Sequence, residues 1–319
     1  MEQEVTRLIS ASKQDFEKMN GRDLKRSIFQ SEGRVIMAQH LLFASQGLVR
    51  GVTNTELLAA FGSDMIMLNT FNLEDEKSNL GLQGLTLEDL KKRVNIPLGI
   101  YLGCPGENKT SENIIYDAAG MLATDEHLLR AKEIGADFIV LGGNPGSGTS
   151  IQDIIETTKR ARKLLGNDVL IFAGKWEDGI DEKVLGDPLA KQDAKEVIKQ
   201  LIDAGADVID LPAPGSRHGI SVRMIQELVQ FIHLYKSGTL AMTFLNSSVE
   251  GADQDSSVEG ADQDTIRLIA LMMKETGADI HAIGDGGFSG CTTPENVMQL
   301  SISLKGKPYT YFRMASRNR

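Results

Sequence analysis

The sequence predicts an α/β fold, a (β/α)8 TIM barrel with an N-terminal helical extension. Two observations predict it. A phrase of the form Gly-x-Asp followed by an apolar run recurs four times, and four further apolar runs alternate with these copies. The length of 319 residues is also within the range of a single such barrel.

The repeated phrase marks the corner between a helix and the strand that follows. Each glycine is expected to end a helix in the left-handed conformation, and each apolar run to form a buried strand. The copies lie about 70 residues apart, roughly twice the length of one βα unit, so each interval must hold another strand. The four copies are GSDMIMLN from Gly62, GADFIVLG from Gly135, GADVIDLP from Gly205 and GADIHAIG from Gly277.

The other four strands are predicted at RVIMAQ from Arg34, IPLGIYLG from Ile96, VLIFAGK from Val169 and LAMTFLN from Leu240. Helical patterns separate the strands, at 124–134, 150–165, 192–204 and 219–235 among others. Strands that alternate with helices pair in parallel through right-handed crossovers. The even spacing favours a closed ring, and an open doubly wound sheet is the alternative.

Three segments are expected. Residues 1–33 form the helical extension and cover the bottom of the barrel, residues 34–304 form the barrel, and residues 305–319 form a basic C-terminal tail that docks on the barrel or on a sister subunit. The nonapeptide SSVEGADQD occupies 247–255 and recurs unchanged at 256–264. It is either an insertion or an artefact of how the chain was recorded, and removing one copy leaves the strand count intact.

Composition restricts the partners. The chain has 34 Lys and Arg against 44 Asp and Glu. This excess of acidic residues argues against extensive electrostatic binding of nucleic acid or of an anionic membrane. Two cysteines cannot build a disulfide framework, and the charged start of the chain lacks the apolar core of a secretory signal. We therefore expect a cytoplasmic protein whose partner is a small phosphorylated metabolite. The faces of its helices are expected to drive formation of a homo-oligomer.

In such barrels the ligand lies at the carboxyl ends of the strands, so functional residues are sought just after each strand. Lys175 ends an apolar strand, where burial lowers the pKa of an amine and favours imine or proton chemistry. Pairing with a phosphate or carboxylate is a third role. An ion pair with Glu177 or Asp178 is the alternative. Asp210 lies inside an apolar run and needs a cation, a metal, Lys175 or a backbone donor.

Binding roles are predicted for several of the remaining positions. Gly286 and Gly287 follow the last strand, where glycine-rich loops expose N–H groups to phosphate; a tight turn is the alternative. Arg217 has a planar guanidinium, which can donate two parallel hydrogen bonds to a phosphate or carboxylate. The other candidates for substrate binding are Gly142, Gly143, Asn69 and Asn246.

Two assignments remain open between a functional and a structural role. His281 is a candidate catalytic residue, although a satisfied core histidine is the more common explanation for a histidine within a strand. A cofactor is not specified by the sequence. Mg²⁺ would suit carboxylates together with phosphate, and its candidate ligands are Asp285, Asp210, and Glu250 or Glu259.

The segments GRVIMAQ, FAGKWEDG and HAIGDGGFSGCTTPENVMQLSISLKGKPYTYFRMA, with the Gly-Ala-Asp phrases, resemble a family of bacterial TIM-barrel proteins of uncharacterised activity. The resemblance covers nearly the whole chain, implies the barrel and carries over no catalytic residue. A more distant similarity is to phosphate-binding barrels that handle sugar phosphates and to phosphoenolpyruvate mutase and aldolase-type barrels. The acidic Mg²⁺ motif of the mutase and isocitrate lyase group is not matched.

These residues together predict an enzyme, a lyase of aldol type or an isomerase, that acts on a small phosphorylated metabolite containing a carbonyl group. Mg²⁺-dependent chemistry on an oxo acid, as in phosphoenolpyruvate mutase, is one alternative. A barrel that binds a phosphorylated metabolite without turnover is the other.

Overall fold

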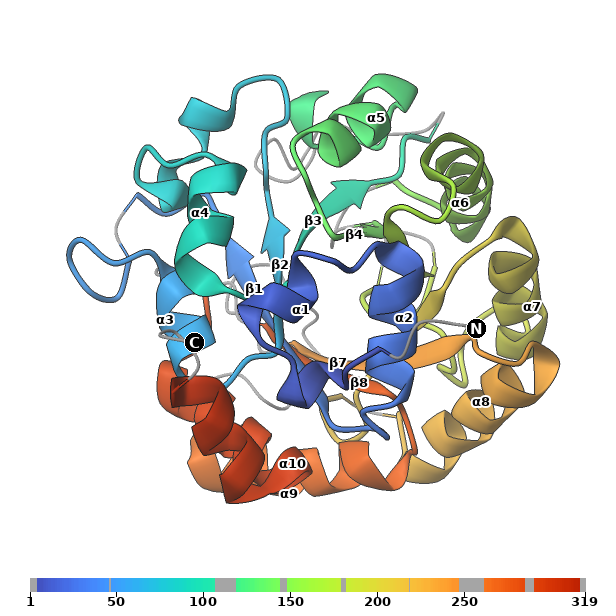
Figure 1. The fold of residues 1–319 in the computed structure, drawn as a ribbon. Helices are drawn as coiled ribbons and strands as arrows, with labels where there is room; N and C mark the ends of the chain where they lie inside the picture. Colours follow the sequence, from blue (N-terminus) through green and yellow to red (C-terminus); the bar gives the residue numbers. More distant parts are fainter. Residues whose placement is uncertain are drawn as a thin grey trace.

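The chain forms a closed barrel of eight parallel strands that neighbour one another in sequence order (Figure 1). The computed structural model describes residues 5–45, 47–106, 119–143, 148–178, 182–217, 219–246, 261–284 and 290–315. The predicted fold class and all eight predicted strands are confirmed. The strands are β1 (Val35–Leu41), β2 (Met65–Asn69), β3 (Leu98–Gly103), β4 (Phe138–Gly142), β5 (Leu170–Gly174), β6 (Val208–Pro212), β7 (Leu240–Asn246) and β8 (Ile280–Gly284).

An α-helix follows each strand and packs on the outside of the ring (Figure 1). These helices are α3 (Asn54–Ala60), α4 (Leu87–Val94), α5 (Asp125–Glu133), α6 (Ile151–Leu165), α7 (Ala194–Ala204), α8 (Val222–Tyr235), α9 (Gln263–Glu275) and α10 (Pro294–Ala315). Residues that face the barrel axis alternate with residues that face the helices, so the core has an inner cluster around Met67 and Phe172 and an outer cluster around Leu68 and Ile171.

The N-terminal segment closes the amino-terminal end of the barrel. It forms η1 (Leu8–Ser10), α1 (Lys13–Phe16) and α2 (Gly21–Phe29), and Figure 1 shows α1 and α2 in front of the strands. Leu8, Ile9, Leu24 and Ile28 are buried in the same cluster as the inner strand residues. A Cβ atom on Gly21 would lie 2.7 Å from a backbone carbon of Val169, so glycine is required where α2 approaches the barrel.

The four Gly-x-Asp corners share one hydrogen-bond arrangement. All four glycines have positive φ, as predicted: Gly62 (107°), Gly135 (86°), Gly205 (111°) and Gly277 (77°). At each corner the aspartate backbone N–H donates to a carbonyl of the preceding strand, and the aspartate side chain accepts the N–H of that same strand residue. The pairs are Asp64 with Ile36, Asp137 with Leu98, Asp207 with Ile171 and Asp279 with Ala241.

Each corner aspartate also meets a basic side chain from a helix. The pairs are Asp64 with Lys305 and Arg313, Asp137 with Lys91, Asp207 with Lys25 and Arg162, and Asp279 with His233. The aspartates therefore join each even-numbered strand to the strand before it and to the helical layer. Because these carboxylates accept both backbone and cationic donors, their charge is well satisfied at the amino-terminal end of the barrel.

The Asp64 corner is the most deeply buried of the four. The Asp64 carboxylate lies 2.7 Å from Lys305 Nζ and 3.1 Å from Arg313 Nε, and all three side chains are at most 1% exposed. Burial lowers the pKa of Lys305 to about 8 although the negative charge of Asp64 opposes the shift. Arg313 also donates to the carbonyls of Leu8 and Ala11, so the end of α10 is tied to the N-terminal segment.

The segment predicted as a C-terminal tail is helical as far as residue 315. The boundary expected between residues 304 and 305 falls inside α10, next to a kink at Gly306 where φ is 79°. Its two buried cations, Lys305 and Arg313, both bind Asp64. Residues 305–315 therefore pack on the barrel of their own chain.

Replacing Asp64 by asparagine should destabilise the protein strongly, because two buried cations would then face a neutral amide. We expect a loss of about 3–5 kcal/mol in the free energy of unfolding. Asp137→Asn is the matched control, since its partner Lys91 is 33% exposed, and should cost about 1 kcal/mol or less. Urea unfolding at neutral pH measures both, and equal losses would contradict the special role of the Asp64 corner.

Candidate functional site

The candidate site lies at the carboxyl ends of the strands, where interior-facing side chains become polar or aromatic. Tyr101 and Phe244 continue the inner face of β3 and β7, and Trp176 follows β5. The Trp176 ring stacks on Phe244 with centroids 5.5 Å apart and meets the Tyr101 ring edge-on at 5.9 Å. This aromatic cluster fills the barrel interior near the carboxyl ends of the strands. It forms an apolar floor beneath the opening of the barrel at that end, which we call the mouth.

Gly142 makes room for this cluster. A Cβ atom at Gly142 would lie 2.9 Å from the Trp176 ring, so the glycine allows the indole to pack across the end of β4. Gly143 is buried directly after β4. The structure thus gives Gly142 a packing role beside the mouth, while the predicted substrate contact of Gly142 and Gly143 stays a prediction.

Asp210 is the buried acid of the site. It lies in β6 on the same face as Val208, pairs in register with Gly174 and Met242, and is fully buried. Neither carboxyl oxygen has a hydrogen-bond partner among the described residues. Burial raises the pKa of Asp210 well above its ordinary value, which favours the protonated acid.

Lys175 follows β5 at the mouth and is 2% exposed. Its ammonium has no hydrogen-bond partner among the residues that the structure describes. Burial lowers the pKa of Lys175 below its ordinary value of 10.5, and the negative charges of Glu182, Asp178 and Glu177 oppose the shift only in part. A lowered pKa increases the fraction of lysine that is the neutral amine. The lone pair of the neutral amine is suited to nucleophilic attack or proton transfer.

Lys175 follows Gly174, the residue of β5 that pairs in register with Asp210 of β6, but Lys175 and Asp210 form no ion pair within the described part of the chain. The ion pair considered between Lys175 and Asp178 is not formed either. The Asp178 carboxylate instead lies 2.7 Å from Arg217 and 2.8 Å from Lys183. Burial raises the pKa of Asp178, but the hydrogen bonds from Lys183 and Arg217 outweigh it and hold the pKa below the usual range.

Arg217 comes from the loop after β6 and its side chain is 5% exposed. Asp178 binds the guanidinium, so the side chain is positioned beside the loop that carries Lys175. A guanidinium fixed in this way has a planar set of donors that suits an oxyanion. The structure thus places Arg217, Asp178 and Lys175 along the β5 and β6 side of the mouth.

His281 lies apart from these residues. It is the second residue of β8, and alternation places it on the opposite face from the interior residues Ile280 and Ala282. Its Nδ1 lies 2.9 Å from Thr243 Oγ1, and burial lowers the pKa of His281 to about 4. The structure does not bring this neutral imidazole onto the interior face that carries Asp210.

Asn69 and Thr70 form a strained turn at the end of β2. Thr70 has a φ of 59°, an uncommon conformation for a β-branched residue, and its N–H donates to Asn69 Oδ1 at 2.7 Å. Thr70 Oγ1 accepts the N–H of Leu42. Strain of this kind is concentrated at functional sites. The hydrogen bond from the Thr70 N–H holds the Asn69 side chain at the end of β2.

Gln39 adds an amide from β1 to the same end. Its Oε1 has no hydrogen-bond partner among the described residues, and a Cβ atom on Gly284 would lie 2.0 Å from it. Gln39 therefore lies over the end of β8. Strand alternation could have placed Gln39, Tyr101 and Phe244 in the mouth from sequence, whereas the strain at Thr70 depends on the folded backbone.

Several predicted site residues lie outside the described ranges. They are Gly286, Gly287, Asp285, Glu250 and Glu259, and for Asn246 the structure describes the backbone alone. Within the described ranges, no group of three or more His, Cys, Asp or Glu side chains is arranged to hold a metal ion. No helix in those ranges combines the length and the apolar character needed to cross a membrane.

The closed ring of parallel strands and the outer helices define a protein of the (β/α)8 barrel class. The chain belongs to the family described as Domain of unknown function (DUF7916), whose model matches residues 9–319. No curated protein sequence matches it at a significant level. The distant similarity to sugar-phosphate barrels and to phosphoenolpyruvate mutase stays a prediction.

One solved structure shares the fold at low sequence identity, and two others are similar with lower TM-scores. The spore cortex-lytic enzyme SleL of Bacillus megaterium QM B1551 is 11% identical, with a TM-score of 0.52 over 85% of this chain and 74% of that one. A Burkholderia cenocepacia J2315 protein described as a candidate lyase or mutase is 14% identical (TM-score 0.46, 86% and 82% covered). The Amycolatopsis orientalis BexX/CysO complex contains a chain 15% identical (TM-score 0.44, 86% and 89% covered).

Replacing Asp210 by asparagine should stabilise the protein at neutral and alkaline pH. Above its ordinary pKa of 3.8 the carboxyl loses its proton in the unfolded chain but keeps it in the fold, so its contribution to stability falls as pH rises. A neutral amide at this position would carry no such penalty. The gain should be near zero at about pH 4 and reach about 1–3 kcal/mol at about pH 8.

Thermal and urea unfolding across this pH range measure the effect. Asp264→Asn is the control, since the Asp264 side chain is 85% exposed and should show little change. A loss of stability in Asp210→Asn at alkaline pH would contradict the interpretation, because it would mean that the carboxylate has a stabilising partner.

Proposed function

We propose that this barrel is an enzyme of lyase or isomerase type that acts on a small phosphorylated metabolite containing a carbonyl group. The observation that carries the proposal is Lys175: a buried amine of lowered pKa at the carboxyl end of β5, without a hydrogen-bond partner in the described structure. Catalytic lysines that form imines are found in such settings, where the neutral amine is accessible near physiological pH.

The proposed chemistry starts with the lone pair of the Lys175 nitrogen. It adds to the carbonyl carbon of the substrate, the π electrons of the carbonyl move to oxygen, and water leaves after proton transfer to give an imine. The protonated imine then accepts the electron pair released by carbon–carbon cleavage or by deprotonation at the neighbouring carbon. A protonated Asp210 supports this proposal as a proton donor, since burial favours its acid form.

Anion recognition is divided between two sides of the mouth in this proposal. Arg217, held by Asp178, binds a phosphate or carboxylate on the β5 and β6 side. Gly286 and Gly287 retain their proposed phosphate role from their position after β8. The aromatic floor of Tyr101, Trp176 and Phe244 excludes water beneath the reacting carbonyl.

The metal-dependent alternative is favoured by a separate observation. Both oxygens of Asp210 are without partners among the described residues, and a buried carboxylate in that state would gain from a bound cation. In this alternative Asp210, Asp285 and Glu250 would hold Mg²⁺, which would supply Lewis-acid polarisation of an oxo acid. We also propose that the chain forms a homo-oligomer with further copies of itself.

Borohydride trapping tests the leading proposal. The protein is incubated with dihydroxyacetone phosphate or ribulose 5-phosphate, reduced with sodium borohydride and digested for mass spectrometry. We expect a stable adduct on the peptide that contains Lys175. Lys175→Ala should abolish the adduct, whereas Lys183→Ala, which removes the neighbouring lysine that pairs with Asp178, should leave it.

The alternatives give different results in the same experiment. Turnover that is lost on chelation, with no Lys175 adduct, would overturn the imine proposal in favour of the metal. Thermal stabilisation by the phosphorylated compounds with no product and no adduct would instead indicate a binding protein without turnover.

A further inference from the structure

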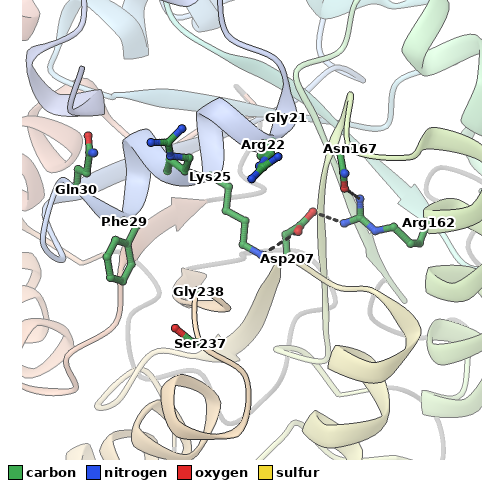
Figure 2. Close-up of a pocket in the computed structure, with 11 residues that line it drawn as sticks. Gly21, Arg22, Lys25, Phe29, Gln30, Arg162, Asn167, Asp207, Ser237 and Gly238 are labelled. Atoms are coloured by element: carbon green, nitrogen blue, oxygen red, sulfur yellow. Dashed lines mark hydrogen bonds and ion pairs between the residues drawn. The ribbon is translucent and has the colours of Figure 1, made fainter. Parts of the chain in front are cut away.

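A cavity lies at the opposite end of the barrel from the candidate active site. It has a volume of ≈ 460 Å³, within the size range of small-ligand pockets. Helix α2 forms one wall, and the chain around the starts of β5, β6 and β7 forms the others, through residues such as Asn167, Asp207 and Gly238 (Figure 2). The N-terminal extension and the barrel thus line this cavity together.

The cavity is strongly basic. One face of α2 carries Arg22 together with Lys25 and Arg26, which follow it by three and four residues. Arg162 of α6 adds a fourth basic side chain to the lining. Asp207 is the single acidic side chain among the described lining residues. This excess of positive charge among the described lining residues stands out in a chain whose net charge is −10.

The charge of Asp207 is already compensated. Lys25 Nζ lies 3.0 Å from one carboxylate oxygen, and Arg162 and the N–H of Ile171 donate to the other. Figure 2 shows Lys25 and Arg162 meeting Asp207 from opposite sides. An anion entering the cavity would therefore meet the positive charges of Arg22 and Arg26 and the remaining donors of Lys25, with the repulsion from Asp207 largely cancelled.

An aromatic ring lies at the edge of the same cavity. Phe29, one turn after Lys25 on α2, is 59% exposed, which is unusual for a phenylalanine. Gln30 and Ser237 add polar groups that can form hydrogen bonds beside the ring. Basic groups next to an exposed aromatic face combine the two features that recognise a phosphorylated compound with a flat ring.

We infer that this cavity is a binding site for a nucleotide, with the phosphate chain on Arg22, Arg26 and Lys25 and the base on Phe29. The site is separate from the proposed active site, because it lies at the amino ends of the strands. A bound nucleotide would contact both α2 and the barrel. Binding would therefore hold the N-terminal extension in place and raise the thermal stability of the chain.

Titration calorimetry with ADP, pyrophosphate and adenosine, on the full chain, tests the inference. We expect ADP to bind, pyrophosphate to bind more weakly, and adenosine to bind weakest, with ADP affinity falling as salt is added. The double variant Arg22→Gln, Arg26→Gln should weaken ADP binding by about tenfold or more. The control double variant Arg223→Gln, Arg267→Gln, which removes the same charge from exposed positions on α8 and α9, should bind normally.

Two further variants separate the base contact and the location. Phe29→Ala should weaken ADP binding and leave pyrophosphate binding unchanged; an unchanged ADP affinity would overturn the nucleotide assignment. Arg217→Gln should leave ADP binding intact. Absence of ADP binding to the natural chain, equal binding by the Arg22 and Arg26 double variant, or loss of binding in Arg217→Gln alone would each overturn the inference.

Discussion

The structure depends on the corner aspartates at the amino-terminal end of the barrel. Each one links the start of an even-numbered strand to the strand before it through two hydrogen bonds, and links both to a basic side chain of the surrounding helices or the N-terminal extension. A parallel barrel leaves the first backbone groups of its strands without partners, and a carboxylate at each corner satisfies one of them. The arrangement occurs at four corners, so alternate pairs of neighbouring strands around the ring are joined by an aspartate.

The two ends of the barrel consequently differ in their electrostatic character. At the amino-terminal end the buried charges are paired, as in the complex of Asp64 with Lys305 and Arg313. At the carboxyl end Lys175 and Asp210 are buried without hydrogen-bond partners in the described structure, and the pKa of each shifts in the direction that favours its neutral form. Buried polar groups in that state reduce stability, and such positions are characteristic of binding and catalytic sites.

The candidate site was only partly accessible from sequence. The candidate residues directly follow predicted strands. This position indicated a site at the mouth, because the carboxyl ends of parallel strands meet at one end of a barrel. It could not show that Asp178 would bind Arg217 and Lys183 rather than Lys175, since that choice depends on the path of the loops. The sequence left His281 open between a catalytic role and a place in the core, and alternation along β8 puts its side chain on the outer face of the barrel.

The sequence by itself determined the number of strands, their order and the conformation of the corner glycines. These features follow from local periodicity and from the steric freedom of glycine, which act over a few neighbouring residues. Only the tertiary structure decided the partners of the corner aspartates. Asp64 binds cations 241 and 249 residues further along the chain, and the choice between such distant groups is made by ring closure, which brings α10 and the N-terminal segment to the same corner.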